Sequence, residues 1–128
     1  MIEFFINRKS TNPSLRMELI LDGRYDYKKS LIDNAIQDSE VTFSMREHET
    51  DVYKILNAPA RIMLMEDGGC SEKYVLEYNW TERDTRYPGI FDGMFEIKFN
   101  GNIKEDGVEY PTGNLIVPIQ EELRIYIK

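Results

Sequence analysis

The sequence predicts an all-β fold, an antiparallel sandwich of about seven to nine short strands. Apolar residues alternate with polar ones at a period of two over most of the chain, as in half-buried strands. Turn residues interrupt this alternation at short intervals. Aromatic residues make up 12% of the chain and suit a pleated, half-buried surface. Because strands and helices do not alternate along the sequence, a parallel α/β fold is not expected.

Five strands are expected in the first half of the chain. Alternating apolar residues mark them at 2–7, 15–21, 41–46, 53–56 and 61–65. Turn residues such as Pro13 and the Asp22–Gly23 pair separate them. The apolar residues between Lys28 and Ser39 have helical spacing, but an isolated helix of this length is marginal in water. We therefore expect a loop with one helical turn there.

Four further strands are expected in the second half. They cover residues 74–80, 91–99, 115–119 and 123–127. Pro118 cannot donate a backbone hydrogen bond, so its strand should lie at a sheet edge or contain a bulge. Gly93 should let another backbone approach its strand closely. The inward-facing positions predict a core between two sheets that includes Leu19, Phe43, Trp80, Phe95 and Ile97.

Length, composition and charge indicate one domain over residues 1–128 and exclude several classes of function. Of the 128 residues, 41% are apolar and 30% charged, an ordinary globular balance. A net charge of −7 argues against coating DNA or RNA. No apolar run approaches the roughly 20 residues of a membrane span, and the first residues do not form a signal peptide. We expect a complete small protein with no nucleic-acid or membrane partner.

Residues capable of catalysis or metal binding are few and scattered. His48 is the single histidine and Cys70 the single cysteine, and the sequence gives neither a catalytic partner. The lone cysteine excludes an internal disulfide and fits folding in a reducing cytoplasm. Glu47, Glu49 and Asp51 alternate beside His48 but do not form a calcium-loop pattern. We therefore expect no enzyme activity, no catalytic or metal-binding residue and no cofactor.

The aromatic residues Tyr74, Tyr78 and Trp80 are open to two interpretations. Spaced along one face of a strand, they could form a platform that stacks sugars, as in carbohydrate-binding β-sandwich modules. Packing in the core is the commoner role at this spacing, and a buried Trp is a frequent packing device in sandwiches. We favour the core and keep a carbohydrate-binding module as the alternative function.

The stretch from Lys73 to Phe99, followed by Tyr110 to Ile119, is the most distinctive part of the sequence. In this stretch, a strand that ends in an aromatic residue is followed by a link that contains Thr and Asp and then by a Pro-Gly turn. An aromatic-Gly-x-Phe strand comes next, and a turn with Pro and Gly follows it. The residues that carry this pattern are Tyr78, Trp80, Asp84, Thr85, Pro88, Gly89, Phe91, Gly93, Phe95, Pro111 and Gly113, with Val41–Met45 as an earlier strand. Together they resemble the immunoglobulin-like N-terminal domain family of phage baseplate upper proteins and related tail and head-fibre adaptors.

This resemblance implies an immunoglobulin-like sandwich that serves as a structural protein in the virion of a tailed phage, after synthesis in the cytoplasm of the bacterial host. Its partners would be other virion structural proteins and copies of itself in a homo-oligomer or ring. Family members often continue into a fibre, whereas nothing follows Lys128, so we expect a stand-alone component or adaptor.

Contacts in such an assembly would use sheet edges, because edge strands carry unpaired backbone groups. The expected edges are Ile2–Arg8, the strand with Pro118 and Leu123–Lys128. The long polar connection Asn100–Gly113 is a second expected contact.

Overall fold

The structure of the protein is a computed structural model that describes most of the chain. The described residues are 1–19, 39–67, 71–100, 104–105, 108–109, 112–118 and 121–128. The loop with a helical turn expected between Lys28 and Ser39 falls almost wholly outside these ranges. Cys70, Ile119 and the side chain of Leu19 also lie outside the described part.

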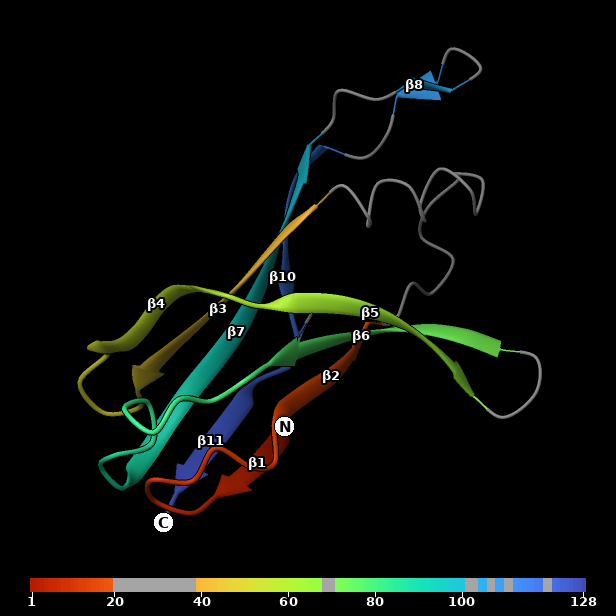
Figure 1. Ribbon diagram of the computed structural model, residues 1–128. Helices are drawn as coiled ribbons and strands as arrows, with labels where there is room; N and C mark the ends of the chain where they lie inside the picture. Colours follow the sequence, from red (N-terminus) through yellow and green to blue (C-terminus); the bar gives the residue numbers. More distant parts are fainter. Residues whose placement is uncertain (20–38, 68–70, 101–103, 106–107, 110–111, 119–120) are drawn as a thin grey trace.

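Two β-sheets packed face to face make up the fold, and the described residues contain no helix (Figure 1). The larger sheet has six strands in the order β1-β11-β7-β3-β4, with β10 paired to β7 beyond β11. The smaller sheet has the order β2-β6-β5, and β8 and β9 form a separate short hairpin. The strands are β1 (Ile2–Ile6), β2 (Leu15–Leu19), β3 (Glu40–Glu47), β4 (Tyr53–Pro59), β5 (Arg61–Asp67), β6 (Ser71–Tyr78), β7 (Gly89–Asn100), β8 (Lys104–Glu105), β9 (Val108–Glu109), β10 (Thr112–Val117) and β11 (Leu123–Ile127).

The strand order is immunoglobulin-like, as the sequence predicted. The chain changes sheets four times, from β1 to β2, from β2 to β3, from β4 to β5 and from β6 to β7. At Ala60, β4 passes into β5 as one ribbon (Figure 1). One expectation needs correction, because not every pair is antiparallel. The first strand, β1, runs parallel to the last strand, β11, from Ile2 beside Leu123 to Ile6 beside Ile127. Long-range pairing of the two ends of the chain makes this possible, and local alternation does not reveal it.

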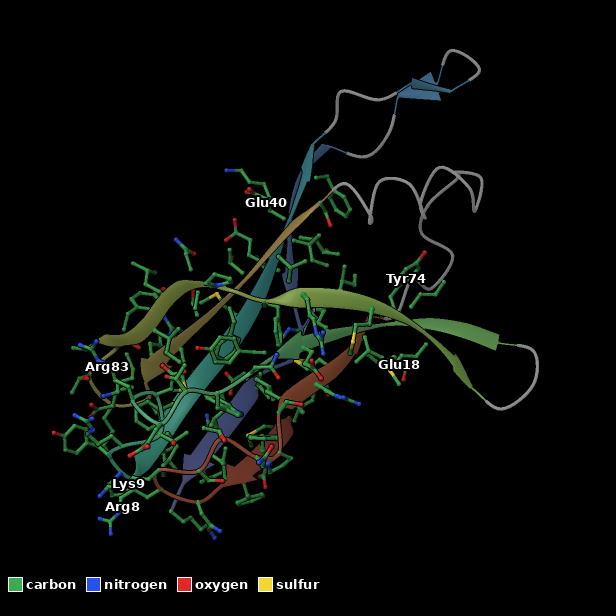
Figure 2. The ribbon with its side chains drawn as sticks, viewed as in Figure 1. Arg8, Lys9, Glu18, Glu40, Tyr74 and Arg83 are labelled. Atoms are coloured by element: carbon green, nitrogen blue, oxygen red, sulfur yellow. The ribbon has the colours of Figure 1, made fainter. Side chains whose placement is uncertain are left out.

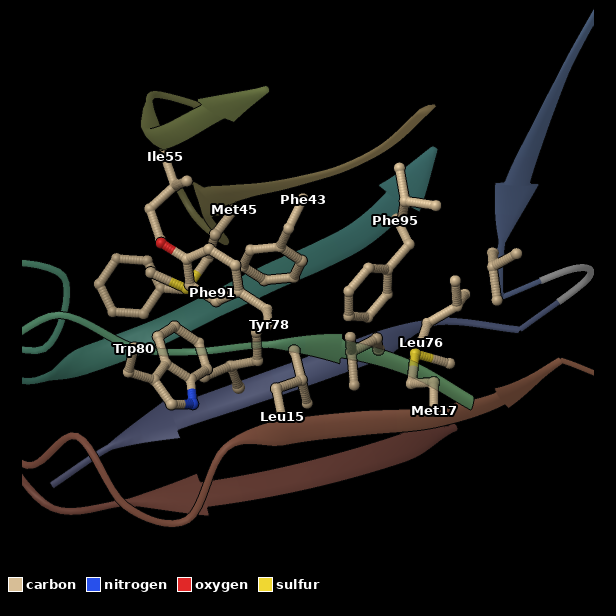
Figure 3. Close-up of a cluster of buried hydrophobic side chains, with 14 of the residues drawn as sticks. Leu15, Met17, Phe43, Met45, Ile55, Leu76, Tyr78, Trp80, Phe91 and Phe95 are labelled. Atoms are coloured by element: carbon tan, nitrogen blue, oxygen red, sulfur yellow. The ribbon is translucent and has the colours of Figure 1, made fainter. Parts of the chain in front are cut away.

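The core is organised around the ring of Phe43, which is fully buried on the inner face of β3. Tyr78 from the opposite sheet stacks on it at a centroid distance of 4.6 Å, and Phe95 lies 5.0 Å away on β7. Trp80 meets the same ring edge-on at 5.7 Å and is only 4% exposed (Figure 3). The predicted burial of Phe43, Trp80, Phe95 and Ile97 is therefore confirmed.

Gly93 was expected to let another backbone come close to its strand, but the atoms that come close to it belong to side chains. A Cβ atom at Gly93 would lie 2.8 Å from Ile125 Cδ1 and 3.2 Å from both Leu123 Cδ2 and Phe43 Cε1. The space that a side chain would take is thus filled by side chains from β3 and β11, which interdigitate across β7.

The connection between β6 and β7 closes one end of the sandwich, at the lower left of Figure 1. The Tyr78 hydroxyl donates a 2.6 Å hydrogen bond to Asp84, whose carboxylate also accepts the Thr81 amide. Burial and this carboxylate raise the pKa of Tyr78, so the phenol stays protonated as the donor. The fully buried Thr85 donates to the Ser10 carbonyl at 2.9 Å. The bond from Thr85, together with one from the Lys9 amide to the Thr85 carbonyl, holds the connection against the β1–β2 loop.

Replacing Trp80 by Ala should lower the free energy of unfolding by about 3–5 kcal/mol, because it empties a site between both sheets. Urea denaturation followed by circular dichroism measures this loss. Val52→Ala, at an exposed position, is the control and should stay within about 0.5 kcal/mol of the parent. A Trp80→Ala protein as stable as the Val52→Ala protein would contradict the packing described here.

Candidate functional site

The outer face of the six-stranded sheet carries a row of apolar side chains that crosses three strands. Phe5, Tyr126 and Ile90 are neighbours in the register of β1, β11 and β7, so their side chains share one face. The rings of Phe5 and Tyr126 stack with centroids 4.8 Å apart. Phe5 is 50% exposed and Ile90 is 44% exposed, large fractions for such residues. We call these three residues the aromatic row.

A groove continues the aromatic row at the closed end of the sandwich. Ile90 belongs to both, and the turn between β3 and β4 and the β6–β7 connection supply the other walls. The groove has a volume of about 520 Å³, within the range of pockets that bind small molecules or single side chains. Its walls include Glu47, His48, Glu49, Lys54, Tyr87 and Ile90. We call it the end groove.

Lysines cover aromatic rings at both ends of this surface. Lys128 Nζ lies 5.0 Å from the ring centroid of Phe5, and Lys54 Nζ lies 4.9 Å from that of Tyr87. Tyr87 is 62% exposed, so it is an accessible part of the end groove. Each cation lies within the distance at which the ring quadrupole attracts it. The surface therefore combines exposed rings with positive charge.

A charged row lies on the same face, next to the aromatic row. Asp92 on β7 has Arg46 of β3 and Arg124 of β11 as its register neighbours. Its Oδ1 atom lies 3.5 Å from Arg124 Nε, and Oδ2 lies 2.8 Å from Nδ1 of His48. Within the described residues, Asp92 Oδ1 and the Nε atoms of Arg46 and Arg124 are buried without a hydrogen bond. This row positions His48 at the rim of the end groove.

The smaller sheet has the same arrangement around Glu77, which is 2% exposed although it lies on the outer face. Arg16 Nε binds Oε2 at 2.7 Å, and Arg61 Nε binds Oε1 at 2.7 Å. Ser14 adds a third hydrogen bond, to Oε2. Burial raises the pKa of Glu77, but the hydrogen bonds from Arg61, Arg16 and Ser14 outweigh it, so the pKa is lowered overall. Both arginine side chains are about half exposed, so they shield the Glu77 carboxylate from solvent while they themselves contact water.

The structure places three of the features that the sequence singled out. His48 does lie in an exposed turn, but its pairing with Asp92 was not foreseen, because 44 residues separate them. Glu47 and Glu49 line the end groove, and the described residues contain no group of acids, histidines and cysteines that could hold a metal. Tyr78 at the end of β6 and Trp80 two residues beyond it are buried, and Tyr74 packs against the core, so the favoured core interpretation is confirmed and these residues form no platform for sugars.

The predicted sheet edges are correct for two strands and wrong for one. β1 ends the order of the larger sheet, and β10 has β7 as its one described neighbour. β11 is not an edge, because β1 covers one side of it and β7 the other. The Asn100–Gly113 connection is shorter than expected, since β7 extends to Asn100 and β10 begins at Thr112.

Comparison with known proteins found no relative of this chain. No family model matches the sequence, no curated protein is significantly similar to it, and no solved structure significantly matches its fold. Within the described ranges, no helix has the length and apolar character needed to cross a membrane.

Glu77→Gln should remove part of the dependence of stability on acid pH. Because the pKa of Glu77 is lower in the folded protein than in the unfolded chain, the ionised carboxylate stabilises the fold above the unfolded value of about 4.3. This contribution disappears as the pH falls through the lowered pKa. Urea unfolding should therefore find the variant about 1–3 kcal/mol less stable than the parent at pH 6.

The difference between the two proteins should narrow toward about pH 3. Glu82→Gln, at an exposed loop position, controls for the loss of one negative charge. A Glu77→Gln protein that loses as much stability on acidification as the parent would contradict the role given to this carboxylate.

Proposed function

We propose that this protein is a structural component of the virion of a tailed bacteriophage and that it works by protein–protein assembly. The observation that carries the proposal is the exposed surface formed by the aromatic row and the end groove, in which apolar side chains lie beside charged ones. Exposed apolar patches rimmed by polar groups are typical of surfaces that bind other proteins. The partner we propose is another structural protein of the particle, with virion localisation following from it.

The composition of this surface supports a protein partner. Aromatic residues are enriched in protein interfaces, where they supply large contact area with few rotatable bonds. Tyr87 and Phe5 are of this kind, and the lysines over their rings could pair with carboxylates of a partner. Arg46, Asp92 and Arg124 provide the polar rim. A stable contact would need to bury about 1,200–2,000 Å² in total.

The chemistry of the end groove supports binding over catalysis. His48 and Asp92 form a pair that in other settings orients a general base. The described walls of the groove, however, contain no serine, threonine or cysteine that such a base could activate. We therefore propose that the protein is not an enzyme.

A glycan-binding role has less support. Sugars stack on free aromatic faces, but the Phe5 ring already has Tyr126 stacked on it and Lys128 over it. Tyr87 is exposed, with Lys54 over its ring, but Phe91, the other aromatic among the described walls of the end groove, is buried, so these walls offer one ring and not a row of them.

The test is to purify particles of the phage or prophage that encodes this chain and to quantify the chain by mass spectrometry. We expect a stoichiometric virion component. A chain that stays out of the particles, and that instead binds a glycan array with micromolar affinity, would refute the proposal.

A pair of matched variants tests the surface itself. Ile90→Glu places a charge in the aromatic row, whereas Leu64→Glu places one at an exposed position of β5, in the smaller sheet. Incorporation into particles should fall about tenfold or more for Ile90→Glu and stay at the parental level for Leu64→Glu. Equal incorporation of both variants would show that the aromatic row is not the docking surface.

A further inference from the structure

Among the described strands, none pairs with the outer edge of β1, so this edge of the larger sheet is open to another strand. Backbone bonds join Ile2 to Glu122 and Ile6 to Lys128, so the even-numbered residues of β1 point toward β11. Because successive residues of a strand point their backbone groups in opposite directions, those of Glu3 and Phe5 face outward. They form a short, regular template for another strand.

The other described edges carry features that hinder such pairing. β4 has register shifts against β3, a positive φ of 51° at Asn57, and Pro59 at its end. β10 is followed by Pro118. β2 carries Arg16 and β5 carries Arg61, the two half-exposed arginines that pair with Glu77. If either strand paired with its counterpart in a second copy, its arginine would lie near the same positively charged arginine of that copy. β1 pairs with β11 in register over all its residues and contains no proline.

We propose that β1 pairs antiparallel with β1 of a second copy of this chain, joining two larger sheets into one. This inference rests on the proposed assembly function and names one of its partners. In the register centred on Phe4, Glu3 of each copy lies opposite Phe5 of the other. Both residues have outward backbone groups, so each such pair exchanges two hydrogen bonds.

Charge complementarity supports a second copy as the occupant of this edge. Lys128 Nζ lies over the Phe5 ring, and Glu3 of the second copy would lie beside that ring, because paired strands are about 4.8 Å apart. Each copy thus offers an exposed carboxylate to the lysine of the other. A register centred on Glu3 would place the two carboxylates opposite each other, which is unfavourable.

The two-fold axis of this pairing keeps the outer faces of both sheets on one side. The dimer would therefore present two aromatic rows and two end grooves to the same neighbour in a particle. Doubling a weak contact in this way raises overall binding strength through effective concentration.

Analytical ultracentrifugation of the full chain tests the pairing. The parent should sediment as a dimer of about twice 15.1 kDa. Glu3→Pro removes an outward amide but leaves the bonds to β11 intact, so it should be monomeric with an unchanged circular dichroism spectrum. Arg83→Glu, whose side chain points away from the ribbon at a distance from β1 (Figure 2), is the control and should stay dimeric.

A charge exchange separates loss of pairing from loss of folding. Glu3→Lys and Lys128→Glu should each raise the dimer dissociation constant about tenfold or more, and the double variant should bring it back toward the parental value. A monomeric parent, or a double variant no better than the singles, would overturn the pairing of β1. Incorporation into particles is measured separately, so a monomeric parent found in virions would refute this inference alone.

Discussion

The packing of the Phe43 ring against three other aromatic rings holds the two sheets of the protein together. Phe43 comes from the larger sheet and Tyr78 from the smaller, so their stacking at 4.6 Å joins the two layers. Trp80 and Phe95 complete the cluster, and Gly93 leaves the space that the Phe43 ring needs. Large aromatic side chains contribute much of the buried apolar area in a domain of this size. The position of Phe43 therefore fixes the register of β3 against β7.

Because successive side chains of a strand point to opposite faces, the residues between the core positions must lie on the outer faces of the two sheets. Both sheets place a carboxylate on a central strand between two arginines, Asp92 in the larger and Glu77 in the smaller. Opposite charges on neighbouring strands stabilise the sheet and keep most of each outer face polar. The aromatic row differs from these charged rows, because it exposes the apolar side chains of Phe5 and Ile90 near the closed end of the larger sheet. We therefore propose the interface at this place.

The sequence predicted the local features well, because a period of two reports directly which residues face inward. The inward sides of β3 and β7, including Phe43 and Phe95, follow from alternation alone. Features that depend on pairing between distant residues could not be predicted in the same way. The parallel contact of β1 with β11 made the last strand interior, and Arg16 reaches Glu77 across 61 residues of sequence.

Most of the candidate site depends on pairing between residues that are distant in the sequence. Phe5, Ile90 and Tyr126 are ordinary strand residues in the sequence, and only the register of three strands brings them into one row. A pair of adjacent aromatics at Phe4 and Phe5 is the one local signal, since alternation requires one of the two to face outward.

An electron-microscopy map of the phage particle would show whether the outer face of the larger sheet is an assembly surface. We expect density for the sandwich in which Phe5, Ile90 and Tyr87 contact a neighbouring subunit. A map in which these side chains face solvent, while the outer face around Glu77 forms the contact, would contradict it.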